Sequence, residues 1–418
     1  MLKLFKSPKL PKGSYILALD IGTEFAKALI IDVKSSQKGI VIGVGRCQQK
    51  LGDMHNGAVM DIASVIDNCK IAIAEAEKMA GVAASQLVLG IAGELVKGDT
   101  TTLSYSREHP ETKIDLSELK NIVHKLQWKC FDEVRSRISQ ETGYNEIDIK
   151  LVNAAVVGMN IDGYKISNPL GFQGKEVEIS IFNSFAPLVH YGALQTIATE
   201  LDLDLLAITV EPYAVARSLT FEDGGDFTAI FIDIGGGTTD IAVVKNGGVV
   251  GTKMFTIGGR VFTKRLAQIL NLSFKEAEKI KLAYSNDELD KNSYKIVREA
   301  MKMDADVWVS GVELSLNDFL DVEILPNKIF LCGGGSQLPE IKEILETQEW
   351  YTNLNFVGTP KVRFLFPKDI SSLEDSTGKL KDLSDITPMA LANISLELAS
   401  EDNVLKSVLK KVVKLMQV

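Results

Sequence analysis

One strand-and-turn pattern occurs twice in this chain of 418 residues and constrains its fold more than any other feature. Its first copy begins at Tyr15 with YILALDI, a GTEF turn, and the runs AKALIIDV and GIVIGVGR. Its second copy begins at Phe227 with FTAIFIDI, GGGTTD and IAVVKNGGVVGTKMFTI. Short apolar runs separated by glycine-rich turns are typical of buried strands. The repeat predicts two similar α/β units that face one another.

The region after the first copy predicts one helix and one more strand. Residues 61 to 79 place apolar side chains at helical spacing, and Gly81 follows as a plausible stop. The run QLVLGIAG at 86 to 93 predicts a strand. The first unit is therefore expected to have the order βββαβ.

The stretch from about 94 to 180 differs in character and predicts an inserted small α+β subdomain. It opens with the polar run TTTLSYSREHPETK, and its expected elements are a helix near 115 to 139 and strands near 147 to 157 and 176 to 182. The following residues predict a helix at PLVHYGALQTIATELDL, a strand LLAITV that ends at Glu211, and a helix in which Pro212 lies in an early turn.

The remaining chain is expected to be mainly helical from about 260 to 317 and to end in an α/β segment near residue 399. The polar tract at 366 to 385 predicts a solvated loop. The predicted division is 14–93 for the first unit, 94–182 for the insertion, 183–223 for a return to the first unit, 224–400 for the second unit, and 402–418 for a C-terminal amphipathic helix.

Composition and charge exclude several classes of protein. The net charge of −9 and pI near 5.2 give no global electrostatic reason to bind nucleic acid. Four scattered cysteines and four dispersed histidines indicate neither a zinc site nor histidine-centred catalysis. The basic start MLKLFKSPKLPKG lacks the apolar core of a signal peptide, and no apolar run reaches the length of a membrane span.

The chemistry of the repeat lies at the ends of its two strands, in Asp20-Ile-Gly-Thr23 and in the turn from Asp233 to Asp240. Glycines let a backbone approach phosphate closely, N–H and Thr hydroxyl groups donate to its oxygens, and carboxylates can hold hydrated Mg²⁺. One such turn alone is more often a plain hairpin. Two of them, at the same point of two repeats, predict a phosphate clamp.

A third glycine turn begins at Gly333, between the strand NKIFLC and the helix LPEIKEIL. This places backbone N–H groups where a nucleotide could rest. The turn is neither a P-loop nor a dinucleotide fingerprint, so the predicted clamp works without a P-loop lysine.

These motifs resemble those of a known superfamily. DIGT at Asp20, IDIGGGTTDIAVV at Ile232 and LCGGGSQLPEI at Leu331 are similar to the phosphate-1, phosphate-2 and adenosine motifs of the actin, heat-shock chaperone and sugar-kinase ATPases. VEPYAVARSL at Val210 is similar to the first connecting motif. Within the superfamily the chain resembles the bacterial cell-division FtsA family, most distinctively over 52–81 and 160–178. The resemblance implies an actin-like ATPase fold of two facing βββαβα domains with an inserted small α+β subdomain.

The resemblance also implies roles for individual residues. Asp20, Asp233 and Glu211 would form the catalytic set, in which the two aspartates face Mg²⁺ through water and Glu211 orients the attacking water of a slow ATPase. The residues expected around the phosphates are Gly22, Thr23, Gly235, Gly236, Gly237, Thr238 and Thr239. Further ATP contacts are expected from Lys27, Gly258, Gly259, Glu278, Lys281, Gly333, Gly334, Gly335 and Ser336. The alternatives are that Glu211 complements a helix dipole and that Glu278 and Lys281 are a surface pair on an exposed helix.

The implied biology is cytoplasmic and peripheral to the inner face of the cell membrane. Like FtsA, the chain would self-associate into actin-like filaments and bind the C-terminal tail of the tubulin-like protein FtsZ. VEPYAVARSL and KLFKSPKLPKGSY are closer to the pilus protein PilM, so a type IV pilus assembly platform is an alternative. A small-molecule kinase of the same superfamily is a further one, although the insertion shows no kinase signature.

The last segment, 404–418, has the pattern of an amphipathic helix. Its apolar face consists of Leu405, Val408, Leu409, Val412 and Met416, and its basic face of Lys406, Lys410, Lys411 and Lys414. Such a helix suits the surface of an anionic bilayer. The alternative is a terminal helix packed on its own protein.

Overall fold

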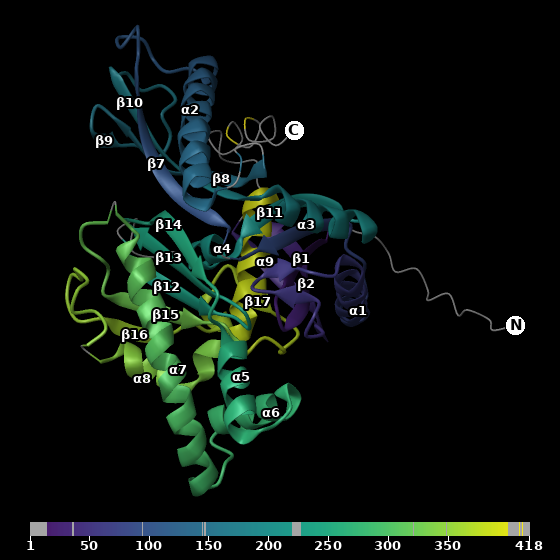
Figure 1. The fold of residues 1–418 in the computed structure, drawn as a ribbon. Helices are drawn as coiled ribbons and strands as arrows, with labels where there is room; N and C mark the ends of the chain where they lie inside the picture. Colours follow the sequence, from purple (N-terminus) through teal and green to yellow (C-terminus); the bar gives the residue numbers. More distant parts are fainter. Residues whose placement is uncertain are drawn as a thin grey trace, which may run out of the picture.

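The structure is a computed structural model that describes residues 15–399, except 36, 94, 144, 146–147, 220–226, 321 and 348, together with Leu409 and Val412. Two sheets and the helices around them make up the body of the molecule, and an insertion projects from one end (Figure 1). Each copy of the sequence repeat supplies three neighbouring strands of one sheet. The two predicted units are therefore present.

The first sheet has the strand order β11-β6-β1-β2-β3-β17. Its strands are β11 (Asp204–Val210), β6 (Gln86–Ile91), β1 (Ile16–Ile21), β2 (Phe25–Ser35), β3 (Lys38–Gln48) and β17 (Leu373–Asp375). Strands β1, β2 and β3 are antiparallel, whereas β6 and β11 run parallel to β1 and to each other. The fully buried run of β1 explains its continuous apolar sequence. We call this sheet and its helices the first unit.

The second sheet has the order β16-β15-β12-β13-β14-β7-β10-β8-β9. Strands β16 (Lys361–Phe364), β15 (Lys328–Cys332), β12 (Ala229–Ile234), β13 (Thr239–Lys245) and β14 (Gly248–Phe255) belong to the second unit. Strands β7 (Lys97–Ser106), β10 (Glu176–Pro187), β8 (Ile149–Ile161) and β9 (Tyr164–Lys165) belong to the insertion. A short hairpin is formed by β4 (Met54–His55) and β5 (Ala58–Val59).

The helices begin and end at the expected signals. They are α1 (Ile62–Ala80), α2 (Leu116–Thr142), α3 (Leu188–Glu200), α4 (Glu211–Ser218), α5 (Gly259–Leu270), α6 (Phe274–Ser285), α7 (Lys291–Asn317), α8 (Pro339–Leu345) and α9 (Ile386–Ala399). Asp61 caps α1 by accepting from the Ser64 N–H, and Gly81 ends it in the left-handed conformation. Ser273 and Glu276 form a capping box at the start of α6.

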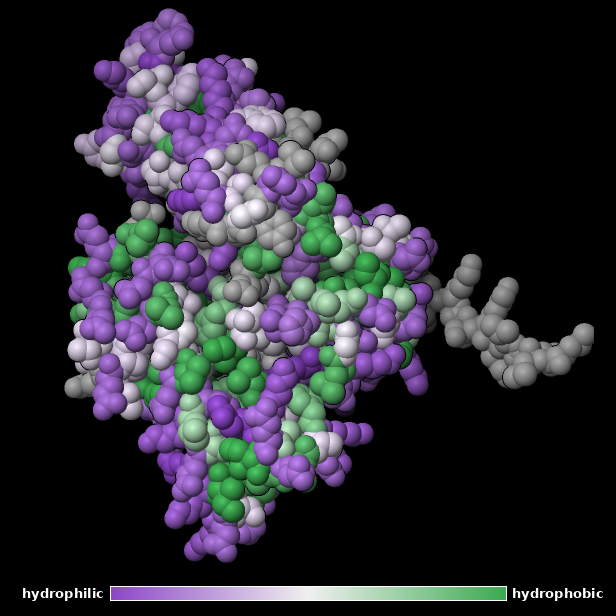
Figure 2. Space-filling view, in the orientation of Figure 1, coloured by the Kyte–Doolittle hydropathy of each residue, from purple (hydrophilic) through white to green (hydrophobic). Residues whose placement is uncertain are grey.

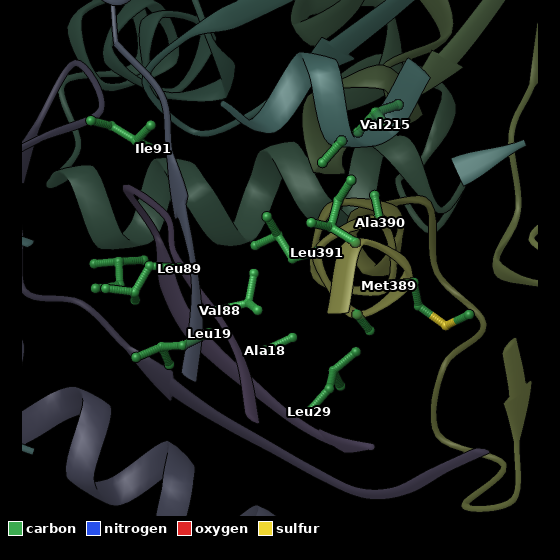
Figure 3. Packing of buried hydrophobic residues seen from close by; sticks show 14 of the residues in the cluster. Ala18, Leu19, Leu29, Val88, Leu89, Ile91, Val215, Met389, Ala390 and Leu391 are labelled. Carbon is green, nitrogen blue, oxygen red and sulfur yellow. The ribbon is translucent and has the colours of Figure 1, made fainter. Parts of the chain in front are cut away.

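Helices α4 and α9 lie between the two sheets and join them. Helix α9 packs on β1, β2 and β6 of the first unit, while α4 packs on α9 and on β12, β13 and β14 of the second. Figure 3 shows Met389, Ala390 and Leu391 of α9 among side chains of the first sheet. Because α9 has apolar residues around much of its circumference, it suits a layer that is covered on several sides.

Three hydrophobic cores divide the described residues. The first lies around the first sheet, the second between the second sheet and α5 to α8, and the third between α2 and the strands of the insertion. Residues from Leu365 onward, including α9, contribute to the first core, although the sequence analysis grouped them with the second unit.

Two local predictions differ from the structure. The polar run at 100–106 forms part of β7, because Thr side chains fit a strand and Leu103 and Tyr105 pack against the third core. The tract at 366–385 is not only a solvated loop. It contains β17, and Asp385 is buried and paired with Arg46.

The C-terminal segment 402–418 falls largely outside the described residues. Leu409 and Val412, which are described, are both helical. They are 3% and 6% exposed and pack with the third core, that of the insertion. Two residues of the predicted apolar face are therefore covered by the protein itself.

We predict that Gly45 cannot accept a side chain. A Cβ atom at Gly45 of β3 would overlap the carbonyl oxygen of Ala72 and lie 2.7 Å from the nitrogen of Ala76, both in α1. Gly45→Ala should lower the free energy of unfolding by about 3 kcal/mol, measured by urea denaturation. Gly52→Ala is the matched control, because a Cβ there would meet no atom within 4 Å. Equal stability of the two variants would contradict the packing of α1 on β3.

Candidate functional site

The two copies of the repeat form equivalent hairpins with charged residues at equivalent positions. In the first hairpin Asp20 of β1 is opposite Lys27 of β2. In the second hairpin Asp233 of β12 is opposite Asp240 of β13. The position that carries an ammonium group in the first unit therefore carries a carboxylate in the second.

The turns of the two hairpins are closed in the same way and contact each other. The Gly22 N–H donates to the Phe25 carbonyl at 3.0 Å, and the Gly235 N–H donates to the Thr238 carbonyl at 2.9 Å. A Cβ atom on Gly236 would lie 2.7 Å from the Glu24 side chain, and one on Gly237 would lie 2.8 Å from the Thr23 hydroxyl. Only glycine allows the turns to approach this closely.

Arg260 of α5 connects the second unit to the first turn. Its guanidinium pairs with Glu24, donates to the Thr23 carbonyl at 2.8 Å, and donates to the Met54 carbonyl at 3.3 Å. Its own backbone N–H donates to the Gly236 carbonyl at 2.8 Å. One residue thus holds both glycine turns in their facing arrangement.

A buried amide network supports the first turn from behind. Asn68 of α1 donates to Gln49 at 2.6 Å and to Asp53 at 2.7 Å. Gln49 in turn donates from its backbone to the Glu24 carbonyl at 2.8 Å. All three side chains are buried, so the loop after β3 is fixed against the turn.

Four carboxylates are buried around the ends of the hairpins. Burial raises the pKa of Asp20 to about 6, and it also raises the pKa of Asp233. The pKa values of Glu211 and Asp240 are raised well above their ordinary range, first by burial and then by neighbouring carboxylates. The side chain of Glu211 fits because its neighbour on β6 is Gly90, where a Cβ atom would lie 2.5 Å from it.

These carboxylates leave a need for positive charge. Lys27 is the cation that opposes the raised pKa values of Asp20, Asp233 and Glu211, and it lies 3.9 Å from Asp20. One oxygen of Asp240 is buried without a hydrogen-bond partner. In the described part of the chain no three acidic, His or Cys side chains gather closely enough to ligate a metal directly. Buried carboxylates with raised pKa values are groups whose charge a divalent cation can compensate.

The expected residues of the second unit surround the start of α5. The Gly259 N–H donates to the Gly235 carbonyl at 2.9 Å, so α5 begins against the glycine turn of the second hairpin. Lys281 of α6 is buried and donates to the Gly259 carbonyl at 3.1 Å and to Thr263 at 2.9 Å. It also pairs with Glu278 at 2.9 Å. The alternative of a surface pair on an exposed helix does not describe Lys281.

The third glycine turn lies beside the second hairpin. Cβ atoms at Gly333 and Gly335 would overlap or crowd the Asp233 and Ile234 region, so the turn packs directly on the end of β12. Gly334 is exposed, whereas Ser336 is buried and donates its hydroxyl to the Gly333 carbonyl at 2.6 Å.

Two residues that were predicted to contact the nucleotide use their hydroxyl groups in hydrogen bonds within the protein. The Ser336 hydroxyl closes its own turn, and the Thr239 hydroxyl donates to the Ile257 carbonyl at 2.6 Å and accepts from Trp308 at 2.9 Å. Both residues are fully buried. In this arrangement they shape the turns and do not present a donor to a ligand.

Sequence reasoning assigned no role to three residues that the structure brings to the site. Asp240 could have been found, since it follows Asp233 at the spacing that separates Lys27 from Asp20. Thr387 of α9 donates to Asp233 from a segment far away in sequence. Arg260 lies in the first turn of α5, and nothing in the sequence around it indicates its contact with Glu24 of the first unit.

The sequence of the chain is similar to those of known proteins. A profile of the family described as Cell division protein FtsA matches residues 230–379. Cell division protein FtsA of Enterococcus faecalis is 23% identical over 402 residues, which cover 91% of this chain and 87% of that protein. FtsA of Streptococcus pneumoniae is also 23% identical, over 80% of this chain and 74% of its own length. The chain is similar to these FtsA proteins over most of its length.

The chain also shares its fold with a solved pilus protein. The structure described as a PilM-PilN type IV pilus biogenesis complex matches with a TM-score of 0.63 and 16% identity, over 93% of this chain and 99% of that one. At this identity the likeness concerns the fold alone. The expected actin-like architecture of two facing domains with an insertion is confirmed.

We predict that Asp20 makes the ligand-free chain less stable at neutral pH. Its pKa is raised from 3.8 to about 6, so the native chain holds a proton that the unfolded chain releases between these values. Stability from this group is present near pH 4 and is lost as the pH rises through about 6. Without metal or nucleotide, Asp20→Asn should exceed the wild type in free energy of unfolding by on the order of 3 kcal/mol near pH 7.5.

The same two proteins should be nearly equal in stability close to pH 4, where both side chains are neutral. Urea denaturation in a chelating buffer at both pH values measures the difference. A wild type that is more stable than Asp20→Asn near pH 7.5 would show that the buried carboxylate is compensated within the protein.

Proposed function

We propose that this chain binds Mg-ATP between its two hairpins and hydrolyses it slowly. The observation that carries the proposal is the facing pair of glycine turns, each beside a buried aspartate, in a chain similar to FtsA. The backbone N–H groups of the turns and the hydroxyls of Thr23 and Thr238 would donate to the phosphates. Lys27 would add a positive charge near the β-phosphate.

The carboxylates would have separate tasks. Asp20 and Asp233 would hold water molecules of Mg²⁺, and the bound ion would supply the charge that their buried oxygens require. Glu211 lies at the first residue of α4 and is buried beside these aspartates. There it would orient the attacking water, and its raised pKa would make its ionised form a stronger proton acceptor for that water. Gly258, Gly259, Glu278 and Lys281 would border the ribose and adenine.

The cellular role that we propose is that of an actin-like cell-division protein. The proposal rests on the similarity to several proteins named Cell division protein FtsA. The chain would self-associate into filaments and bind the FtsZ tail at the inner face of the cell membrane. Pull-down with purified chain and ATP tests this partner. Recovery of FtsZ supports the proposal, and recovery of pilus assembly proteins supports the PilM-like alternative.

The proposed function includes membrane attachment through residues 404–418. No helix within the described residues is both long and apolar enough to cross a bilayer. Leu409 and Val412, from the face that would enter the headgroup region, are buried against the insertion. We propose that this face exchanges between the insertion and an anionic membrane surface.

The first prediction of this function concerns Asp233. Asp233→Ala should weaken Mg-ATP binding by at least about tenfold, because the second hairpin loses its carboxylate toward the cation. The stability of the ligand-free chain should not fall in proportion, since this carboxylate is buried with a raised pKa. Isothermal titration calorimetry measures the affinity. Equal binding by variant and wild type would refute the assignment.

The second prediction separates binding from hydrolysis. Glu211→Gln keeps the size of the side chain in the space beside Gly90, so the fold and ATP affinity should be retained. Turnover should fall by about a hundredfold or more, because the proton acceptor for water is lost. Single-turnover phosphate release measures this step. An unchanged rate would leave Glu211 as a helix-start charge only.

The third prediction concerns the tail. Truncation after Asp402 should leave ATP binding intact and abolish co-sedimentation with vesicles that contain anionic lipid, because the basic and apolar faces are removed together. A truncated chain that still sediments with vesicles would show that 404–418 is not the anchor. A truncated chain that unfolds would show that Leu409 and Val412 are part of the fixed core of the insertion.

A further inference from the structure

A row of three charged residues crosses the first sheet beside the start of α9. Asp20 of β1 is opposite Lys27 of β2, and Lys27 is opposite Arg46 of β3. Figure 2 shows hydrophilic side chains on the outer surface of the insertion, whereas the side chains of Asp20 and Lys27 are only 7% and 12% exposed. Residues that are directly opposite on antiparallel strands lie on the same face of the sheet. Two cations, Lys27 and Arg46, are therefore neighbours on one face.

The two neighbouring cations contact consecutive residues of the connection that leads into α9. Arg46 pairs with Asp385, whose side chain is 1% exposed. Lys27 donates to the backbone carbonyl of Ser384. Like charges that are directly opposite on two strands are destabilising. Asp385 compensates the charge of Arg46, and the Ser384 carbonyl remains as an acceptor for Lys27.

The side chain of Asp385 also fixes the backbone that carries this carbonyl. Its second oxygen accepts from the N–H groups of Lys381 and Asp382, both at 3.0 Å. These bonds cap the short 3-10 helix η4 (Leu383–Asp385). A carboxylate that accepts several such bonds is held firmly in place. The position of the Ser384 carbonyl therefore depends on the side chain of Asp385.

The same segment is attached to the third glycine turn of the second unit. The Gly333 N–H donates to the Leu383 carbonyl at 3.0 Å. The side-chain amide of Gln337, at the end of this turn, donates to Asp382 at 2.6 Å. The segment that contacts Lys27 of the first unit is thus held by the second unit as well.

We propose that Asp385 is a positioning residue for the nucleotide site and acts through Lys27. By pairing with Arg46 and fixing the Ser384 carbonyl, it keeps the Lys27 ammonium group 3.9 Å from Asp20. Without the charge of Asp385, the guanidinium of Arg46 would compete with Lys27 for the Ser384 carbonyl and for Asp20. This role rests on the proposed function, in which Lys27 meets the β-phosphate of the nucleotide.

The reactivity of Lys27 in the ligand-free chain tests whether Asp385 positions it. Reductive methylation with formaldehyde and cyanoborohydride, followed by peptide mass spectrometry, measures the rate at each lysine. Asp385→Asn should raise the rate at Lys27 by about threefold or more, because the amine loses a fixed hydrogen-bond acceptor. Lys281 is an internal control, since its side chain is similarly enclosed, at 10% exposed, and its rate should not change.

Asp375→Asn is the matched control variant. Asp375 caps the same connection by accepting from the N–H groups of Thr377 at 2.9 Å and Leu380 at 3.0 Å. It is opposite Val41 of β3, several residues away from Arg46, so this variant should leave the rate at Lys27 unchanged.

A second variant, Gln337→Ala, keeps the test decisive if Asp385→Asn does not fold. It removes the half-buried amide that holds Asp382 and leaves the buried ion pair in place. The rate at Lys27 should rise by about twofold, because the segment loses one of its anchors. Rates at Lys27 that match the wild type in every folded variant of the segment would overturn the proposal.

A double-mutant cycle then tests whether Asp385 acts on the nucleotide through Lys27. Asp385→Asn should weaken Mg-ATP binding about fivefold in the wild type and less than about twofold in the Lys27→Met background, measured by calorimetry. An equal loss in both backgrounds would overturn this role alone and leave the proposed function intact. A wild type that binds no Mg-ATP would overturn the proposed function, and this role with it.

Discussion

The burial of like charges in one cleft is the constraint on which the rest of the structure depends. Asp20, Asp233, Glu211 and Asp240 are all buried, and Lys27 is an ammonium group that stabilises the charged forms of the first three. Such a cluster opposes folding unless protons or a cation compensate it. The raised pKa values are the response of the ligand-free chain. In the function that we propose, a hydrated divalent ion with a polyphosphate would compensate the same charges.

The packing around the cleft resists the separation of the two units. Helices α4 and α9 fill the space between the sheets. Arg260 of the second unit pairs with Glu24 and donates to the Thr23 carbonyl in the turn of the first hairpin. Thr387 extends the influence of α9 to Asp233 itself. The same helices that bury the apolar faces of both sheets therefore fix the relative positions of the two hairpins. Changes in the cleft and changes in the angle between the units are expected to be coupled through α9.

The sequence predicted the parts of this site that are local and left out the parts that depend on distant contacts. The hairpins followed from strands with continuous apolar runs, and α1 followed from its apolar spacing and the Gly81 stop, because these signals are carried by residues close together in the chain. The hydrogen bond from Thr387 to Asp233 joins segments that are far apart in sequence, and so do the contacts of Arg260 with Glu24 and Thr23. No sequence periodicity relates these segments. The strand at 100–106 was overlooked because most of its residues are polar and only Leu103 and Tyr105 mark its buried face. The cover of Leu409 by the insertion could not be told from a membrane-facing stripe, since both use the same helical spacing.

The central claim is that the two hairpins act on one ligand, and a double-mutant cycle tests it most directly. Mg-ATP affinity is measured by calorimetry for the wild type, Asp20→Asn, Asp233→Asn and the double variant. Two aspartates that hold water molecules of one cation should lose less together than the sum of their separate losses, with a coupling free energy of about 1 kcal/mol or more. Strictly additive losses, or single variants that bind as the wild type does, would contradict a shared site between the hairpins.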